Sequence, residues 1–307
     1  MIDINCKYSG WYSLPFLIRK IKKIINHHQP DIIHSHLNPV SWYTALAKPR
    51  SIPQVHSMHT YYSYDTETKP WKLSYERKYL LKRSDVNIIT INAFLEKDLR
   101  SCVDIKGHVF NLSNFIEDKY FITQQRKNSQ DSFKLLAVGN IRELKNYPYL
   151  IEIFKHLKNT AISVDIYGAG DHSNMKRICE ENGLAVRFMG QTEDASRVYP
   201  DYDGFIMPSL FESFGLSAYE AMAMGLTVFL SEIKPFTEQI GENALYFPLN
   251  DAEAAAKVIR SAVENRPALE VRRTKAKDFV YRTARRDSYV HGLLSIYNKI
   301  LNRSEAK

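Results

Sequence analysis

Short apolar runs rich in β-branched residues alternate along this chain with longer amphipathic stretches. In the longer stretches apolar residues recur at helical spacing, as in Tyr147–Leu157, where Leu150 and Phe154 share a face. This alternation is typical of βαβ units and parallel sheets, so the sequence predicts an α/β fold. The runs that we predict as strands are Asp31–Ser35, Pro53–Ser57, Val86–Thr90, His108–Leu112, Phe133–Val138, Ile162–Tyr167, Val186–Met189, Gly204–Met207, Thr227–Leu230 and Ala244–Phe247.

A polar stretch without apolar periodicity, Gln124–Ser132, interrupts the alternation and is the best linker candidate. A length of 307 residues suits two domains of about 100–200 residues each. We therefore expect two doubly wound, Rossmann-like domains at residues 1–124 and 133–280. Residues 281–307 are predicted to form a C-terminal helix, Ser288–Leu301 at its end, which returns to the first domain.

The composition excludes several classes of protein. A content of 44% hydrophobic and 25% charged residues is typical of globular proteins, and no run of about 18 apolar residues predicts a membrane span. The N-terminus lacks the pattern of a secretory signal. Cys6, Cys102 and Cys179 lie far apart, which argues against zinc or disulfide frameworks and suits the cytoplasm. The net charge of +8 fits anionic partners, but no nucleic-acid-binding motif is present.

The segment Gly204–Gly225 is predicted to be a strand, a loop and a helix that begins near Ser217. Ligands of open parallel sheets bind beyond the carboxyl ends of strands, and a helix N-terminus there favours an anion. Glu212 and Glu220 lie in this loop and helix. Each also has a structural interpretation: Ser217-Ala-Tyr-Glu220 matches a capping box, and Glu212 is compatible with a solvated loop acid. Judged alone, these residues leave both interpretations open.

The wider string PSLFESFGLSAYEAMAMG resembles the signature of the retaining GT-B glycosyltransferases of family 4 (glycosyl transferases group 1), in which Glu-x7-Glu stands in a Pro-Ser…Phe-Gly…Glu-Ala-Met frame. The resemblance continues through Val228–Glu238 and NALYFPLND, and upstream through AVGNIRELKN, IYGAGD and VRFMGQ. It extends from about Pro30 to Val258. It implies two Rossmann-like domains facing a cleft, and transfer of a sugar from a nucleoside diphosphate donor to an acceptor hydroxyl with retention.

The resemblance also implies roles for individual residues. Glu212 would contact the donor sugar, the amides of Phe214, Gly215 and Leu216 would face sugar and diphosphate, and Glu220 would accept hydrogen bonds from the ribose hydroxyls. His59, in PQVHSMHT, matches a histidine beside the donor sugar. The implied catalytic residues are Glu212 and His59, and the implied donor-binding residues are Gly139, Arg142, Lys145, Ser213, Phe214, Gly215, Leu216 and Glu220.

The turn GNIRELKN offers two cations, Arg142 and Lys145, for the diphosphate that departs with negative charge. Relatives place the arginine directly after the glycine, where this chain has Asn140. Either Arg142 reaches in from two positions later, which we favour, or the clamp depends mainly on Lys145. Cations in loops are also often only solvated. With two positive charges present, no divalent metal and no cofactor are expected.

Four histidines, His34, His36, His56 and His59, follow two neighbouring predicted strands. No carboxylate or cysteine joins them at ligand spacing, so packing at strand ends is favoured over a metal site. Trp11–Ile25 is basic and amphipathic. It is expected to be a core-facing helix, and its lysines are also suited to an anionic membrane at the cytoplasmic face.

The family normally begins with a strand, a Gly-rich turn and a helix, which this sequence is expected to lack, so the first domain is predicted to be incomplete. The function implied is a hexosyltransferase-like step in polysaccharide or glycoconjugate synthesis, with a glycan or lipid-linked acceptor. Three alternatives remain: a non-catalytic nucleotide-sugar-binding subunit, a sugar-nucleotide epimerase, and an NAD-type oxidoreductase. The last has only Gly168-Ala-Gly170 in its favour.

Overall fold

The computed structural model describes residues 14–36, 38–63, 80–122 and 131–305. They form two compact units, Met1–Ser113 with Tyr289–Lys307, and Asn114–Ser288. Most of the predicted linker Gln124–Ser132 lies outside the described residues, as do Trp11–Ser13. Within the described ranges, no helix is both long enough and apolar enough to cross a bilayer.

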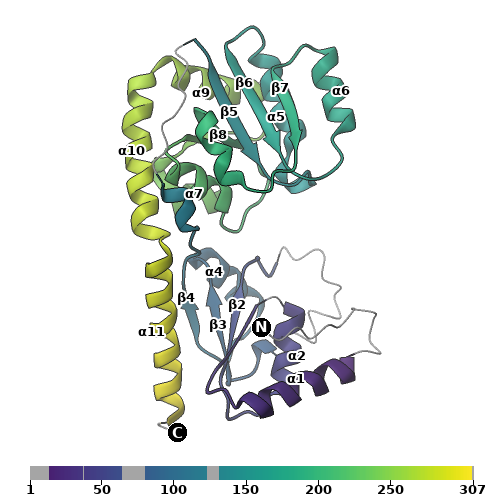
Figure 1. The fold of residues 1–307 in the computed structure, drawn as a ribbon, viewed down its shortest axis with the longest axis vertical. Coiled ribbons are helices and arrows are strands. Elements are labelled where there is room, and N and C mark those ends of the chain that lie inside the picture. Colours follow the sequence, from purple (N-terminus) through teal and green to yellow (C-terminus); the bar gives the residue numbers. More distant parts are fainter. Residues whose placement is uncertain (1–13, 37, 64–79, 123–130, 306–307) are drawn as a thin grey trace. The chain divides into compact units, whose positions relative to one another are not determined.

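The first unit contains a four-stranded parallel sheet in the order β1-β2-β3-β4 (Figure 1). From Tyr289 onward, α11 belongs to this unit, and its Ile296 and Ile300 pack with Val55 and Ile89. Its strands are β1 (Ile33–His36), β2 (Gln54–Met58), β3 (Val86–Thr90) and β4 (Val109–Asn111), and its helices are α1 (Leu14–His28), α2 (Asn38–Ala47), α4 (Ala93–Cys102) and most of α11 (Arg286–Glu305).

The second unit contains a six-stranded parallel sheet in the order β10-β9-β8-β5-β6-β7. The chain winds outward from β5 through β6 to β7, then returns to β8 on the other side of β5, so the switch point lies between β5 and β8. Its strands are β5 (Phe133–Val138), β6 (Ile162–Tyr167), β7 (Val186–Gly190), β8 (Gly204–Met207), β9 (Thr227–Ser231) and β10 (Leu245–Phe247). Its helices are α5 (Tyr147–His156), α6 (Ser173–Glu181), α7 (Leu216–Ala223), α8 (Lys234–Ile240), α9 (Ala252–Glu264) and α10 (Arg266–Thr283).

The structure confirms the predicted α/β class and parallel sheets. Four strands have the predicted limits, namely Val86–Thr90, Phe133–Val138, Ile162–Tyr167 and Gly204–Met207, and the other predicted strands differ by one or two residues at their ends. Apolar β-branched runs are reliable here because parallel strands covered by helices are buried on both faces.

Strands β5 and β6 approach each other closely at their carboxyl ends. The amide of Gly139, which follows β5, donates a hydrogen bond to the carbonyl of Tyr167 at 2.9 Å. A Cβ atom on Gly168 would lie 1.9 Å from the carbonyl oxygen of Gly139. Gly168 is therefore required by packing, which gives a structural reason for the glycine pair that prompted the oxidoreductase alternative.

Gly168→Ala is expected to lower the free energy of unfolding by about 3 kcal/mol, because the added methyl group overlaps backbone atoms. Urea unfolding of the purified variant measures this. Gly183→Ala is a matched control: a Cβ there meets nothing within 4 Å, and only its φ of +59° opposes a side chain, at about 1 kcal/mol. Equal, small losses in both variants would contradict the close packing of β5 on β6.

Candidate functional site

Two loops of the second unit meet at the switch point of its sheet. One follows β5 and contains a 3-10 turn, Glu143–Lys145, and the other follows β8 and leads into α7. The amide of Leu210 donates a hydrogen bond to the carbonyl of Leu144 at 2.9 Å, which fixes one loop against the other. This is the region where open parallel sheets bind their ligands.

A lysine and a glutamate join the two loops. The ammonium of Lys145 lies 2.5 Å from Oε1 of Glu212, and the hydroxyl of Ser209 donates to the same oxygen at 3.1 Å. The side chains of Lys145 and Glu212 are 23% and 16% exposed, so the pair is accessible to a ligand yet partly shielded from water. The structure thus brings together Lys145 and Glu212, which stand 67 positions apart in the chain and were both predicted from the sequence as residues of the donor site.

Gly139 lies against the stem of Lys145. Its carbonyl accepts a hydrogen bond from the hydroxyl of Tyr147 at 2.9 Å, and a Cβ on Gly139 would lie 3.0 Å from Cε of Lys145. The glycine therefore leaves room for the lysine stem. Arg142 is exposed in the same turn and lines a cavity of about 160 Å³ with Pro148 and Met175. Among the described residues no ion pair joins Arg142 to Glu212, and its contact with the diphosphate stays a prediction.

Gly215 begins α7 in a conformation that disfavours side chains. It is the N-cap of the helix, with φ of 82° and ψ of 51°, and a Cβ there would lie 2.6 Å from Cε1 of Phe236. Phe214 is buried and stacks on Tyr219 with ring centroids 4.3 Å apart, and the carbonyl of Ser213 accepts from Gln239 at 3.4 Å. Leu216 is the first helical residue. The amide of Ala218 already donates to the carbonyl of Gly215 at 2.8 Å, whereas the amides of Leu216 and Ser217 come before the first helical hydrogen bond.

The capping-box interpretation of Glu220 is wrong. Because Gly215 adopts a left-handed conformation, α7 begins at Leu216, and Ser217 is already inside the helix. Glu220 consequently lies in the second turn rather than at the third helical position. Its Oε2 accepts a hydrogen bond from the hydroxyl of Tyr199 at 2.8 Å, a partner that the sequence did not reveal.

In the first unit, His59 follows β2 and contacts a second histidine. Its Nε2 lies 3.2 Å from Nδ1 of His36, and His36 stacks on His34 with centroids 4.4 Å apart. His34 contacts the hydroxyls of Ser57 at 2.7 Å and Tyr297 of α11 at 2.5 Å. The sequence missed Tyr297, because no local pattern links it to β1.

Burial keeps these histidines neutral at neutral pH. It lowers the pKa of His34 to about 4, with smaller contributions from His36 and His59, and lowers the pKa of His56 to about 3. Burial also lowers the pKa of His36 and of His59. Over the described part of the chain, no three His, Cys, Asp or Glu side chains are grouped as metal ligands.

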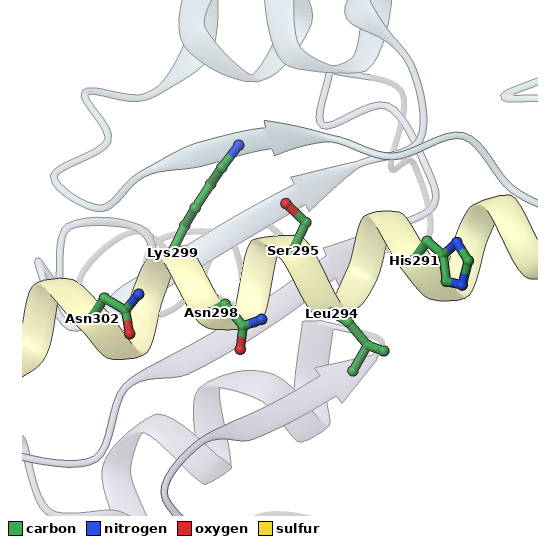
Figure 2. A pocket seen from close by; sticks show the side chains of 6 residues that line it. All are labelled: His291, Leu294, Ser295, Asn298, Lys299 and Asn302. Atoms are coloured by element: carbon green, nitrogen blue, oxygen red, sulfur yellow. The ribbon is translucent and has the colours of Figure 1, made fainter.

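A separate hollow of about 450 Å³ lies on α11 (Figure 2). All of the residues that line it come from this one helix, and their side chains point in different directions from it. The hollow is open and has no second wall of described residues, so we assign it no part in the site. Its lining residues are His291, Leu294, Ser295, Asn298, Lys299 and Asn302.

Two family models match the chain. Residues 118–279 match "Glycosyl transferases group 1", and residues 3–119 match "Glycosyltransferase Family 4". A relative from Klebsiella pneumoniae, described as an uncharacterized 41.2 kDa protein in the cps region, is 22% identical over 93% of this chain and 83% of its own length.

Solved structures share the fold. A glycosyltransferase from Rickettsia africae superposes with a TM-score of 0.80 at 19% identity, covering 98% of this chain and 84% of the other. Anabaena HepE, solved in complex with UDP, gives 0.78 at 16% identity, over 94% and 83%. The predicted GT-B architecture is thereby confirmed. The group 1 model alone spans more than half of the chain, and the chain therefore belongs to the glycosyl transferases group 1 family of glycosyltransferases.

Proposed function

We propose that this chain transfers a sugar from a nucleoside diphosphate donor to an acceptor hydroxyl, and that the donor binds at the two loops joined by Lys145 and Glu212. The observation that carries the proposal is the placement of a cation, a carboxylate and the N-terminus of α7 around one switch point. Anabaena HepE, which has the same fold, was solved with UDP bound.

The arrangement suits the charge that develops when the donor breaks. The bond from the anomeric carbon to the β-phosphate oxygen is cleaved, and the negative charge passes to the diphosphate. Lys145 and the first amides of α7 would stabilise this charge, because a helix N-terminus and a fixed cation both favour anions. The acceptor oxygen then bonds to the anomeric carbon, and its proton passes to the leaving phosphate.

The finer parts of the reaction are carried over from the family resemblance. We propose that the configuration at the anomeric carbon is retained, that Glu212 and His59 contact the donor sugar, and that Arg142 assists Lys145. No metal and no cofactor are required in this proposal. The acceptor that we favour is a glycan or lipid-linked sugar used in polysaccharide synthesis at the cytoplasmic face of a membrane.

The donor site is tested by isothermal titration of UDP, GDP and ADP. One of the three is expected to bind, and Lys145→Ala should weaken its binding about tenfold, which corresponds to one charge-assisted contact of about 1.4 kcal/mol. Lys155→Ala is the matched control, because Lys155 also pairs with a glutamate, Glu152, at 2.7 Å on the surface of α5. Equal affinities for both variants would contradict the proposed diphosphate site.

Glu212→Gln is expected to change binding and turnover in opposite directions. Glu212 pairs with Lys145 at 2.5 Å, so removal of its charge leaves the ammonium to the nucleotide and should tighten nucleoside diphosphate binding about threefold, as expected for a partly exposed pair. The sugar loses a charge-assisted acceptor, and kcat should fall about 10- to 100-fold. Titration and a donor-hydrolysis or transfer assay measure the two effects. Weaker binding of the nucleotide would contradict competition for Lys145.

The exposed side of α1 is suited to peripheral contact with an anionic membrane. Ile21 and Ile25 are buried, whereas Phe16 is 63% exposed and Lys22 and Lys23 are exposed. Basic groups and an exposed aromatic ring on one helix favour anionic headgroups. This feature would bring the enzyme to a lipid-linked acceptor.

Lys22→Glu combined with Lys23→Glu should weaken binding to phosphatidylglycerol-containing vesicles, measured by co-sedimentation, at least about 30-fold, since each of the two basic residues near such a surface contributes about 1 kcal/mol. The control variant carries Lys257→Glu and Lys275→Glu, which alter exposed lysines of α9 and α10 by the same charge. Vesicles of phosphatidylcholine alone should bind none of the proteins. Equal binding of both charge variants would exclude α1 as the contact.

A further inference from the structure

Two tyrosines from distant segments meet at the carboxylate of Glu220. The hydroxyl of Tyr199 donates to Oε2 of Glu220 at 2.8 Å, and the hydroxyl of Tyr120 makes a further hydrogen bond to this carboxylate. Both tyrosines are buried, and their rings meet edge to face with centroids 5.8 Å apart. The three residues lie on a 3-10 turn at Asp118–Phe121, a 3-10 turn at Tyr199–Asp201, and α7.

Each tyrosine is held in place by contacts of its own. Tyr199 is fully buried, stacks on Phe205 of β8 with centroids 6.2 Å apart, and its hydroxyl lies 3.3 Å from the carbonyl of Ser217. The short segment that carries Tyr120 is tied to the second unit by a hydrogen bond from the amide of Ile116 to the carbonyl of Ala284 at 3.1 Å. The hydroxyl donors at Glu220 are therefore rigid.

The surroundings of Glu220 shift the pKa of its carboxyl in opposite directions. Burial raises the pKa of this carboxyl, and Glu117 adds to the rise, whereas the hydrogen bonds from Tyr199 and Tyr120 and the charge of Lys119 lower it. Burial and the nearby carboxylate also raise the pKa of Tyr199 and of Tyr120, so both hydroxyls stay protonated and act as donors. Without these two hydrogen bonds the pKa of the Glu220 carboxyl would rise further, so the neutral acid would persist to a higher pH.

The carboxylate has room for more than these donors. A carboxylate has about four lone-pair sites, so two tyrosine hydroxyls leave sites for two further donors. The vicinal hydroxyls of a ribose supply two donors at the spacing of one carboxylate.

We propose that Tyr120 and Tyr199 are positioning residues that hold the Glu220 carboxylate in one orientation, so that its remaining lone pairs accept hydrogen bonds from the ribose hydroxyls of the donor nucleotide. This inference rests on the proposed function, because it assumes that the donor nucleotide binds at this site and that Glu220 contacts its ribose, as the family resemblance implies. Their hydrogen bonds also lower the pKa of this buried carboxyl and so oppose the effect of burial, and an ionised carboxylate is the form that accepts from both hydroxyls.

The test compares a ribonucleotide with a form that lacks both hydroxyls. The probes are whichever of UDP, GDP and ADP binds the wild-type chain, and its 2′,3′-dideoxy counterpart, titrated at pH 8 and pH 6. The wild type should prefer the ribonucleotide by about tenfold. Tyr199→Phe and Tyr120→Phe should each weaken ribonucleotide binding about three- to tenfold and leave dideoxynucleotide binding nearly unchanged, so the preference narrows.

The pH dependence has a defined sign. Removing a tyrosine hydroxyl removes a contact that lowers the pKa of Glu220, so the pKa of the variant rises and the neutral acid becomes more populated as the pH falls. The loss of ribonucleotide affinity should therefore be larger at pH 6 than at pH 8. Tyr202→Phe is the matched control. The hydroxyl of the buried Tyr202 also donates to a carboxylate, that of Asp165 in β6, at 2.7 Å, so this variant loses the same kind of contact away from Glu220.

The outcomes separate this inference from the proposed function. If Glu220→Gln abolishes the ribonucleotide preference while both tyrosine variants keep it at each pH, the positioning role is wrong and the donor site stands. If Glu220→Gln keeps the full preference, Glu220 does not contact the ribose, so the positioning role is wrong while the site at Lys145 and Glu212 stands. If no nucleotide binds the wild type, both fall together. Should Tyr199→Phe unfold, Tyr120→Phe carries the test alone, because Tyr199 stacks on Phe205 of β8 whereas Tyr120 lies on the turn Asp118–Phe121 outside the sheet.

Discussion

The order of strands in the second unit determines what its loops can do. Because β8 pairs with β5 on the side opposite β6, the segments that follow β5 and β8 leave the same edge of the sheet as neighbours. The amide of Leu210 then bonds to the carbonyl of Leu144, and Lys145 pairs with Glu212 across the same junction. A change in strand order would separate these residues, whereas changes elsewhere on the surface would not.

Glycines give this junction its shape. Gly168 allows β6 to approach the turn after β5, and Gly215 begins α7 where any side chain would meet Phe236. Both positions were open to functional interpretations in the sequence, one as part of a dinucleotide-binding turn. The close backbone packing explains Gly168 without a ligand, and the family match supports sugar transfer in place of hydride transfer.

Local patterns in the sequence predicted more of the fold than of the site. Apolar runs predicted the strands, most clearly the central ones β2, β3, β8 and β9, which are buried along their whole length. The loop residues Lys145 and Glu212 were found through the family signature. The capping box failed because the left-handed Gly215 moves the helix start two residues earlier, a property of one dihedral angle. Tyr120 and Tyr199 stand 100 and 21 positions from Glu220 (220 − 120 and 220 − 199), so only the folded chain shows their contact.

A crystal structure of the chain with a bound nucleoside diphosphate tests the donor site most directly. We predict that the β-phosphate lies within hydrogen-bond distance of the Lys145 ammonium and the first amides of α7, that the Lys145–Glu212 distance increases from 2.5 Å, and that the ribose hydroxyls face Glu220. A nucleotide bound away from these two loops, with the Lys145–Glu212 pair unchanged, would contradict the proposed site.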